Sequence, residues 1–214
     1  MNNELYQLLL SLRLGDGAYV TQRKGYPKTY YIKTNSISHD YLAYKRKIFE
    51  RNNIVTKDIV CQSGYNKLSD IKGFTTLTIA EATLVGNMSI DDIIEDLTIE
   101  GLVYYYLDDG SLHKRKHFMN LYCNSFTIDE TNHLIDKLHE LFPQKRCTLC
   151  YDRKKDGRVF PYVYVPCSVA KSFNVFVRKF LLDNNIDSLL YKTFSPSQTI
   201  ENIGQTVSRR KRLF

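Results

Sequence analysis

Hydrophobic residues fall into two runs of helical spacing, each ending at an acidic residue that is followed by glycine. The first run, residues 5–14, leads to Asp16, and the second, residues 98–107, leads to Asp109. Apolar positions that recur every three or four residues predict amphipathic helices, and a glycine just past the last apolar position predicts where each helix ends. Because both runs end in the same way, the chain reads as two related halves.

The segments behind each run repeat one order of elements. In the second half, β-branched and aromatic stretches predict strands at residues 118–126, 147–153 and 159–165. A capping box formed by Thr127 and Glu130 predicts the start of a helix, and a last helix is predicted from Ser168 to about Leu182.

The first half follows with strands at 18–23, 30–34, 59–62 and 74–79 and a helix at 40–52; Asn35–Ser38 there mirrors Asn124–Thr127. Each half therefore reads helix, two strands, helix, two strands, helix. The fold class is α+β or mixed α/β.

The join between the halves is predicted near residues 86–96, where residues 89–96 read as an acidic helix. No Lys or Arg occurs between Gly73 and Leu112, so this stretch is not expected to lie against phosphates. It is also shorter than the matching part of the second half, so the last helix of the first half is expected to be trimmed. We divide the chain into residues 1–92, residues 93–195 and a basic tail at 196–214.

Charge narrows the class of partner. The 214 residues include 30 Lys and Arg against 23 Asp and Glu, a net charge of +7 with a pI near 9.0. This balance favours a polyanion, with nucleic acid first and an anionic membrane surface second, although an ordinary basic enzyme would fit as well.

Other bulk features bear on the compartment. No apolar stretch approaches the ~20 residues that span a bilayer, and the N-terminal residues do not resemble a signal peptide. Five cysteines, an odd number, fit a reducing compartment. We expect a cytoplasmic, organellar or nucleoid protein that is neither secreted nor bound to a membrane.

The repeated acids suggest a chemistry. An acid in the last turn of a helix lies at the negative end of the helix dipole, which costs about 0.3–1 kcal/mol. If the two helices pack side by side, Asp16 and Asp109 meet, and they repel unless a proton or a metal lies between them. Oxygen ligands favour Mg²⁺ over zinc, and a metal held by carboxylates in a basic protein indicates phosphodiester hydrolysis. A simple glycine helix stop explains either motif alone, but the duplication favours a paired site.

These two runs resemble LAGLIDADG motifs, and the chain resembles the single-chain, two-motif LAGLIDADG homing endonucleases. The resemblance is strongest at residues 101–110 and 121–130 and is also clear at Leu190–Lys192. It implies an α+β monomer of two pseudo-symmetric αββαββα lobes. The lobes would pack through the motif helices, and their antiparallel sheets would form a saddle over DNA.

The resemblance also implies the site. Asp16 and Asp109 would be catalytic and would each bind Mg²⁺, one acid per active site, with Mn²⁺ able to substitute. The carbonyl groups of Gly15 and Asp108 would be further metal ligands, and Lys192 would be a basic catalytic residue beside one site. Cleavage of a long double-stranded target would leave 3′ overhangs.

The first half departs from this pattern. The counterpart of Lys192 would fall near Gly86–Asp92, where only neutral and acidic residues stand. The two strands would then be cut unequally, and a nicked intermediate would accumulate.

Candidate DNA-binding residues are the basic side chains on the predicted strands and hairpin turns. They are Arg23, Lys24, Lys28, Lys33, His113, Arg115, His117, Arg153, Lys154, Lys155 and Arg158. Long polar side chains on alternate strand positions can reach base edges, whereas lysines in turns are better placed for phosphates.

Two other functions fit the same pattern. An RNA maturase would use the basic saddle on intron RNA, a second candidate partner, and a catalytically inactive DNA-binding regulator would use the fold without its metal. Retention of both acids favours the nuclease, because RNA binding does not need Asp16 and Asp109 paired.

Overall fold

The computed structural model describes residues 1–21, 28–60 and 70–195. Two four-stranded antiparallel sheets are present, one in each half of the chain. The first contains β1 (Ala18–Thr21), β2 (Tyr30–Ser36), β3 (Thr56–Val60) and β4 (Lys72–Thr76) in the order β1-β2-β4-β3; the second contains β5 (Gly110–His113), β6 (Phe118–Tyr122), β7 (Thr148–Arg153) and β8 (Val159–Val165) in the order β5-β6-β8-β7. The strand orders correspond one to one, which confirms the predicted duplication.

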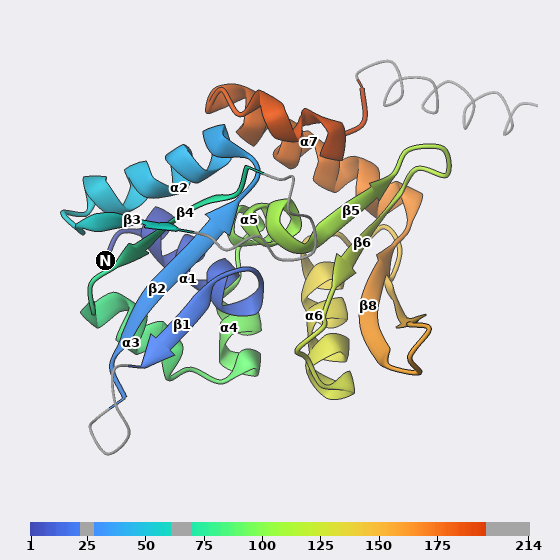
Figure 1. The fold of residues 1–214 in the computed structure, drawn as a ribbon. Helices are drawn as coiled ribbons and strands as arrows, with labels where there is room; N and C mark the ends of the chain where they lie inside the picture. The colour runs from blue at the N-terminus through green and yellow to red at the C-terminus, as the bar shows by residue number, and fades with distance from the viewer. Residues whose placement is uncertain (22–27, 61–69, 196–214) are drawn as a thin grey trace, which may run out of the picture.

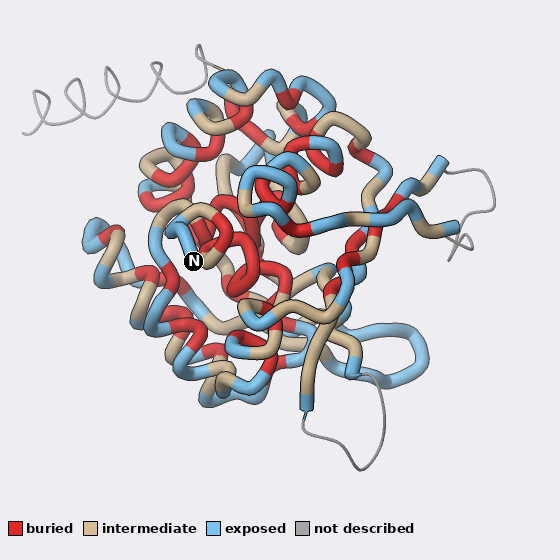
Figure 2. Tube along the Cα trace, turned by 90° about the vertical axis from the view of Figure 1, so that its left-hand side faces the viewer, coloured by how far each residue is buried: buried red, intermediate tan, exposed pale blue. Residues whose placement is uncertain are grey.

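The two motif helices lie between the sheets (Figure 1). They are α1 (Asn3–Leu14) and α5 (Ile99–Asp109), and they pack against each other. Every residue from Gly101 to Leu107 is buried, including the three consecutive tyrosines Tyr104–Tyr106. Figure 2 shows the buried residues concentrated in these central helices. A helix that is buried on all sides is stabilised by packing against its neighbours and has no face in contact with water.

Other helices cover the sheets. In the first lobe, α2 (His39–Arg51) packs on β2, β3 and β4, and the short α3 (Ala80–Gly86) lies against β2. In the second lobe, α6 (Ile128–Leu141) packs on β7 and β8, and α7 (Cys167–Asp183) packs on β6 and α5. The chain between the lobes forms α4 (Ile90–Asp96), and the 3₁₀ helix η1 (Asp187–Lys192) follows α7. The 7-residue α3 against the 17-residue α7 confirms that the last helix of the first lobe is trimmed.

Several predicted boundaries were wrong. The strand expected at residues 118–126 ends at Tyr122, because the chain turns before the capping box of α6. The last helix is capped by Pro166 rather than Ser168. The strands expected at 59–62 and 74–79 are β3 and β4, each beginning earlier than predicted; residues 61 and 62 lie outside the described residues. The order of elements required a strand at β5, but no bounds were predicted for it, because it follows the motif acid without a break and is only four residues long.

The predicted division between residues 92 and 93 falls inside α4. Both capping boxes in this region, at Ser89 and at Thr127, have the side chain of the first residue bonded to the backbone N–H three residues on. Within the described ranges, no helix is both long and apolar enough to cross a bilayer.

Candidate active site

The ends of the two motif helices meet at the centre of the molecule. Gly15 follows the last residue of α1, and its N–H donates to the carbonyl oxygen of Ser11 at 2.9 Å. A Cβ atom added to Gly15 would lie 2.2 Å from Oδ2 of Asp109, the last residue of α5. Such a distance is far below van der Waals contact, so only glycine allows the Asp109 carboxyl to lie this close to the end of α1. The structure therefore brings the two motif ends together, as the sequence predicted.

The opposite end of α5 is held by α1 as well. The buried side chain of Gln7 accepts a hydrogen bond from the backbone N–H of Thr98 at 2.9 Å and donates one to the carbonyl oxygen of Asp96 at 2.9 Å. Thr98 is the N-cap residue of α5 and makes no capping bond with its own side chain. Gln7 thus satisfies a helix-terminal N–H that would otherwise be unpaired and sets where α5 begins relative to α1.

Asp109 is in an unusual electrostatic environment. Burial, together with repulsion from Asp16 and Asp108, raises the pKa of its carboxyl group to about 7. Its Oδ2 atom is buried and has no hydrogen-bond partner among the described residues. A buried carboxylate oxygen without a partner is costly, and a bound cation would remove that cost. Asp16, by contrast, is exposed.

The side chain of Asp108 is bound by a lysine from the other lobe. Nζ of Lys45, on α2, donates to Oδ1 and Oδ2 of Asp108 at 2.6 and 2.8 Å. The side chain of Lys45 is 0% exposed and that of Asp108 is 5% exposed. Burial raises the pKa of the Asp108 carboxyl group, and the Lys45 ammonium works against that rise.

Lys192 lies at the same helix end. Its Nζ donates to the carbonyl oxygen of Leu107 at 2.6 Å and lies 3.5 Å from the carbonyl oxygen of Asp108. Its own carbonyl oxygen accepts a hydrogen bond from the hydroxyl of Tyr106 at 2.7 Å, which fixes η1 against α5. Burial lowers the pKa of Lys192, and the nearby carboxylates oppose this shift. The structure therefore places Lys192 beside the Asp109 motif.

The oxygen atoms at this site fit a hard divalent cation whose ligands include backbone carbonyl groups as well as carboxylates. No group of three or more His, Cys, Asp and Glu side chains in the described parts of the chain is arranged to hold a metal ion. Two carboxylates, at Asp16 and Asp109, together with backbone carbonyl groups and an incoming phosphate are oxygen ligands of the kind that Mg²⁺ prefers. The unpartnered Oδ2 of Asp109 is the observation that supports such a site.

The predicted DNA-binding residues are mostly exposed. Lys28 and Lys33 lie before and on β2, His113, Arg115 and His117 lie at the β5–β6 hairpin, and Arg153, Lys154, Lys155 and Arg158 lie at the β7–β8 hairpin. All but the half-buried His117 are exposed. Lys154 pairs with Asp152 and Arg158 pairs with Asp156, so part of their charge is already balanced. Arg23 and Lys24 lie outside the described residues.

Sequence reasoning missed Lys45. A signal was present, because Lys45 stands four residues after Tyr41 and three before Ile48, both fully buried positions of α2. A lysine within the apolar stripe of a helix must meet an acidic partner in the folded protein. The sequence alone does not say which acid that is.

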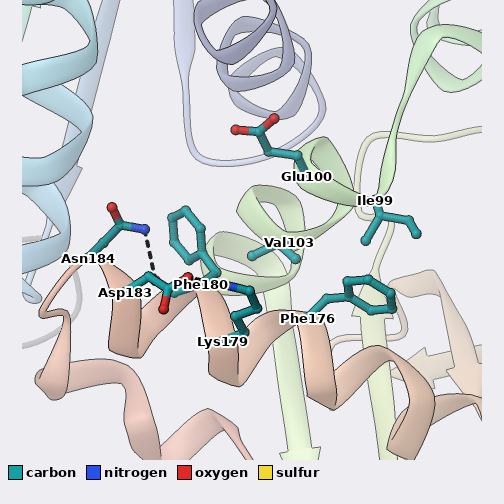
Figure 3. A pocket seen from close by; sticks show the side chains of 8 residues that line it. All are labelled: Ile99, Glu100, Val103, Phe176, Lys179, Phe180, Asp183 and Asn184. Carbon is teal, nitrogen blue, oxygen red and sulfur yellow. Dashed lines mark hydrogen bonds and ion pairs between the residues drawn. The ribbon is translucent and has the colours of Figure 1, made fainter.

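A pocket of about 330 Å³ lies elsewhere, between α5 and α7 (Figure 3). It is lined by Ile99, Glu100, Val103, Phe176, Lys179, Phe180, Asp183 and Asn184. These residues of α5 belong to its N-terminal half, whereas Asp109 ends the helix roughly 9 Å further along its axis from the nearest of them. The pocket is therefore separate from the motif acids.

Comparisons with known proteins agree with this geometry. Residues 7–173 match the model of the LAGLIDADG DNA endonuclease family. The DNA endonuclease I-ChuI of Chlamydomonas applanata is 26% identical over 196 residues, which cover 82% of this chain and 89% of that protein.

Two solved structures share the fold. The homing endonuclease I-WcaI bound to its DNA recognition sequence has a TM-score of 0.67 and 16% identity, covering 90% of this chain and 87% of that one. I-DmoI in complex with DNA and Ca has a TM-score of 0.57 and 13% identity, covering 81% and 88%. At these identities the likeness shows the fold alone.

Proposed function

Because the chain belongs to the LAGLIDADG DNA endonuclease family, we propose that it is a site-specific endonuclease that hydrolyses phosphodiesters of double-stranded DNA with Mg²⁺. One observation carries the proposal: the two motif ends meet with the Asp109 carboxyl group against Gly15 and its Oδ2 buried without a partner. A bound cation would give this buried oxygen the partner that the described residues do not supply.

In this proposal Asp16 and Asp109 would each hold a metal ion, one acid per active centre, and the carbonyl groups of Gly15 and Asp108 would be the further protein ligands. The metal, when bound, lowers the pKa of a water molecule and stabilises charge on the departing oxygen. Lys192 lies beside Asp109 with a lowered pKa, so its ammonium can give up or hold a proton near the phosphate. Mn²⁺ is expected to substitute, and solved relatives include I-DmoI complexes with DNA and Ca and with DNA and Mn.

The DNA would lie across both sheets. The lobes that carry them correspond to residues 1–92 and 93–195, with the basic tail at 196–214 beyond. Exposed basic side chains on β2 and on the two hairpins of the second sheet supply contacts to phosphates and base edges. The two lobes are part of one chain, so a monomer can read a long asymmetric target. Each centre would cut one strand and leave a 3′ overhang.

The two centres are not equivalent, which supports unequal cleavage of the strands. Lys192 is at the end of α5, whereas the matching stretch of the first lobe, Gly86–Asp92, contains no basic residue. We expect the strand served by Asp16 to be cut more slowly, so that nicked plasmid accumulates in a time course. Equal disappearance of both strands with no nicked species would contradict this part of the proposal.

The alternatives from the sequence gain no separate support. The relatives compared above are named as DNA endonucleases or were solved with DNA. A maturase acting on intron RNA, or a catalytically inactive regulator, would need neither the meeting of Asp16 with Asp109 nor a lysine at the same helix end.

Substitution of the two acids tests the proposal. A cleavage selection on a genomic or randomised library would first supply a target. Asp16→Asn and Asp109→Asn should each slow cleavage by about 10²–10⁴-fold, because removing a metal ligand forfeits several kcal/mol of transition-state stabilisation. DNA binding, measured by gel shift in Ca²⁺, should be retained.

Asp129→Asn is the matched control, because Asp129 is an exposed aspartate in the first turn of α6 and belongs to neither motif. It should cut as the wild type does. If both motif variants still linearise target plasmid at the wild-type rate in Mg²⁺, the assignment of the site is wrong.

A further inference from the structure

We infer that Lys45 of the first lobe is a positioning residue for the active centre of the second lobe. Its ion pair with Asp108 fixes the last turn of α5 and so the carboxyl group of the next residue, Asp109. The inference rests on the proposed nuclease function and extends it to a residue outside both motifs.

The ion pair is built for rigidity. Both oxygens of Asp108 accept from the same Lys45 ammonium, at 2.6 and 2.8 Å, and neither side chain has appreciable access to water. The ammonium also lies 4.4 Å from the centroid of the Tyr41 ring, a cation–π contact. These contacts hold the Lys45 ammonium in one position. Because Asp108 is bound to that ammonium, its carboxyl group is held in place as well.

The helix that carries Lys45 is itself fastened to the second lobe. At its N-terminal end, the Asp40 carboxylate accepts from the backbone N–H of Ser188 in η1 at 2.9 Å and from the Ser188 hydroxyl. One turn on, the Tyr44 hydroxyl lies 3.4 Å from that of Tyr104 in α5. Lys45 therefore approaches Asp108 from a helix whose place against α5 and η1 is already set.

Loss of Lys45 would act locally on the second centre. Asp108 would become a buried carboxylate without a partner, one residue before Asp109, and would have to move or take up a proton. Either response removes the contact that holds the end of α5, where Asp109 lies against Gly15. Misplacement of a reacting group by about 1 Å can cost on the order of 10²-fold in rate.

Among the described residues, the first centre has no lysine reaching it from the matching helix of the other lobe, so the inference predicts an effect on one strand only. Lys45 is the seventh residue of α2, and the seventh residue of α6 is Leu134, a fully buried apolar side chain. The first motif also has Gly15 where the second has Asp108. A change at Lys45, in the first lobe, should therefore impair the strand that the second lobe cuts.

The experiment is a strand-resolved time course with Lys45→Met, which removes the charge and keeps an unbranched apolar stem. Target DNA is labelled at the end of each strand, and the strand lost in Asp109→Asn defines the second centre. Lys45→Met should slow that strand by about 10–100-fold and the other by no more than about twofold, at equal folded protein. Lys47→Met, the same change at an exposed position of α2, should leave both rates unchanged.

A double variant separates the positioning effect from the effect of charge balance. Its thermal stability can be measured without a DNA target. Lys45→Met should lower Tm by roughly 6–20 °C, because it leaves a buried charge unpaired. The double variant Lys45→Met/Asp108→Asn should recover most of that Tm, while the strand of the second centre stays slow.

Equal slowing of both strands, or recovery of both Tm and rate in the double variant, would overturn the inference. These results are distinct from failure of the proposed function, in which the wild-type protein itself would cut neither strand.

Discussion

The helices α2 and α6 occupy the same place in the two lobes and yet do different things. Each begins at a hydroxyl residue, Ser38 or Thr127, and each has aspartate as its second residue. α2 extends polar groups into the other lobe, where Asp40 binds η1 and Lys45 binds the end of α5. The two helices therefore share a backbone plan but not a role.

α6 instead bonds to the connection between the lobes. His133 lies 2.9 Å from a carboxylate oxygen of Asp91, and Lys137 donates to the carbonyl oxygen of Glu95 at 2.7 Å, both on α4. The position that matches Lys45 is apolar. A duplicated chain can keep its strand order and helix packing while the polar groups at matching positions diverge.

The same contrast holds for the two motif acids. Asp109 is half-buried and lies near Lys192, Lys45 and Asp108, whereas Asp16 is exposed. Both lysines thus gather at the end of α5. In the proposed function, the second centre therefore combines groups of both lobes, and the first centre has neither of these two lysines at its own helix end.

Lys192 offers the largest effect that tests this contrast. Lys192→Met should slow the strand served by Asp109 by about 10²–10⁴-fold, because it removes the group that we propose transfers a proton at the phosphate. If the wild-type protein cuts that strand faster, the variant should narrow the gap between the strands or reverse it. A quenched-flow time course on strand-labelled target measures both rates.

Lys179→Met is the control for this change, since Lys179 is an exposed lysine of α7 in the same lobe. It should leave both rates as in the wild type. A Lys192→Met protein that slows the strand assigned to Asp16 would show that the pairing of lysine and acid is the reverse of the one proposed.

The sequence predicted the repeated features and two of the divergent ones, the short last helix of the first lobe and the absence of a basic counterpart to Lys192, but not the contact of Lys45 with Asp108. Helix ends at glycine, the capping box at Thr127 and the order of strands follow from local patterns, and the structure confirms them. Asp16 and Asp109 could be paired because each motif is locally recognisable. Lys45 and Asp108 could not, because their contact joins α2 to α5 and no local pattern records which buried lysine meets which acid.

The predicted bounds of helices and strands were wrong where tertiary packing determines them. β5 begins at the residue after Asp109, so no turn or loop residues separate the helical pattern from the strand. The role of Gln7 could not be predicted either. Its side chain accepts a hydrogen bond from the N-terminus of α5, and this contact exists only once the two helices have packed together.

Gly15 offers a middle-sized effect. It occupies the position before the acid that Asp108 fills in the second motif, and an added Cβ would overlap Oδ2 of Asp109 at 2.2 Å. Gly15→Ala should cost about 1–3 kcal/mol of stability through overpacking and slow the strand served by Asp109 by roughly 10–100-fold through its displacement. Thermal unfolding and strand-resolved rates at saturating DNA separate the two consequences.

Retention of the wild-type rate on that strand in Gly15→Ala would show that the Asp109 carboxyl can be moved without harm. That result would remove the close approach of the two motif ends as the basis of the site, even if the protein were less stable.

The smallest expected effect compares Asp40 with Asp129, the matching aspartates of α2 and α6. Burial alone would raise the pKa of Asp40, but hydrogen bonds from Ser188 and Ser38 outweigh it and lower the pKa from 3.8 to about 2. A carboxylate whose pKa falls on folding stabilises the folded state above its unfolded pKa, and this contribution disappears as the pH falls from about 4 to about 2.

Asp40→Asn should therefore lower Tm by roughly 2–4 °C at pH 7, the shift expected for about 1 kcal/mol in a chain of this length, and the deficit should shrink below pH 4. Asp129→Asn removes the same favourable charge from the first turn of a helix, so subtracting its effect leaves the part of Asp40 that comes from Ser188 in the other lobe. If the two variants lose equal stability at every pH, the contact between α2 and η1 contributes nothing beyond the helix dipole. The difference between α2 and α6 would then lie in Lys45 alone.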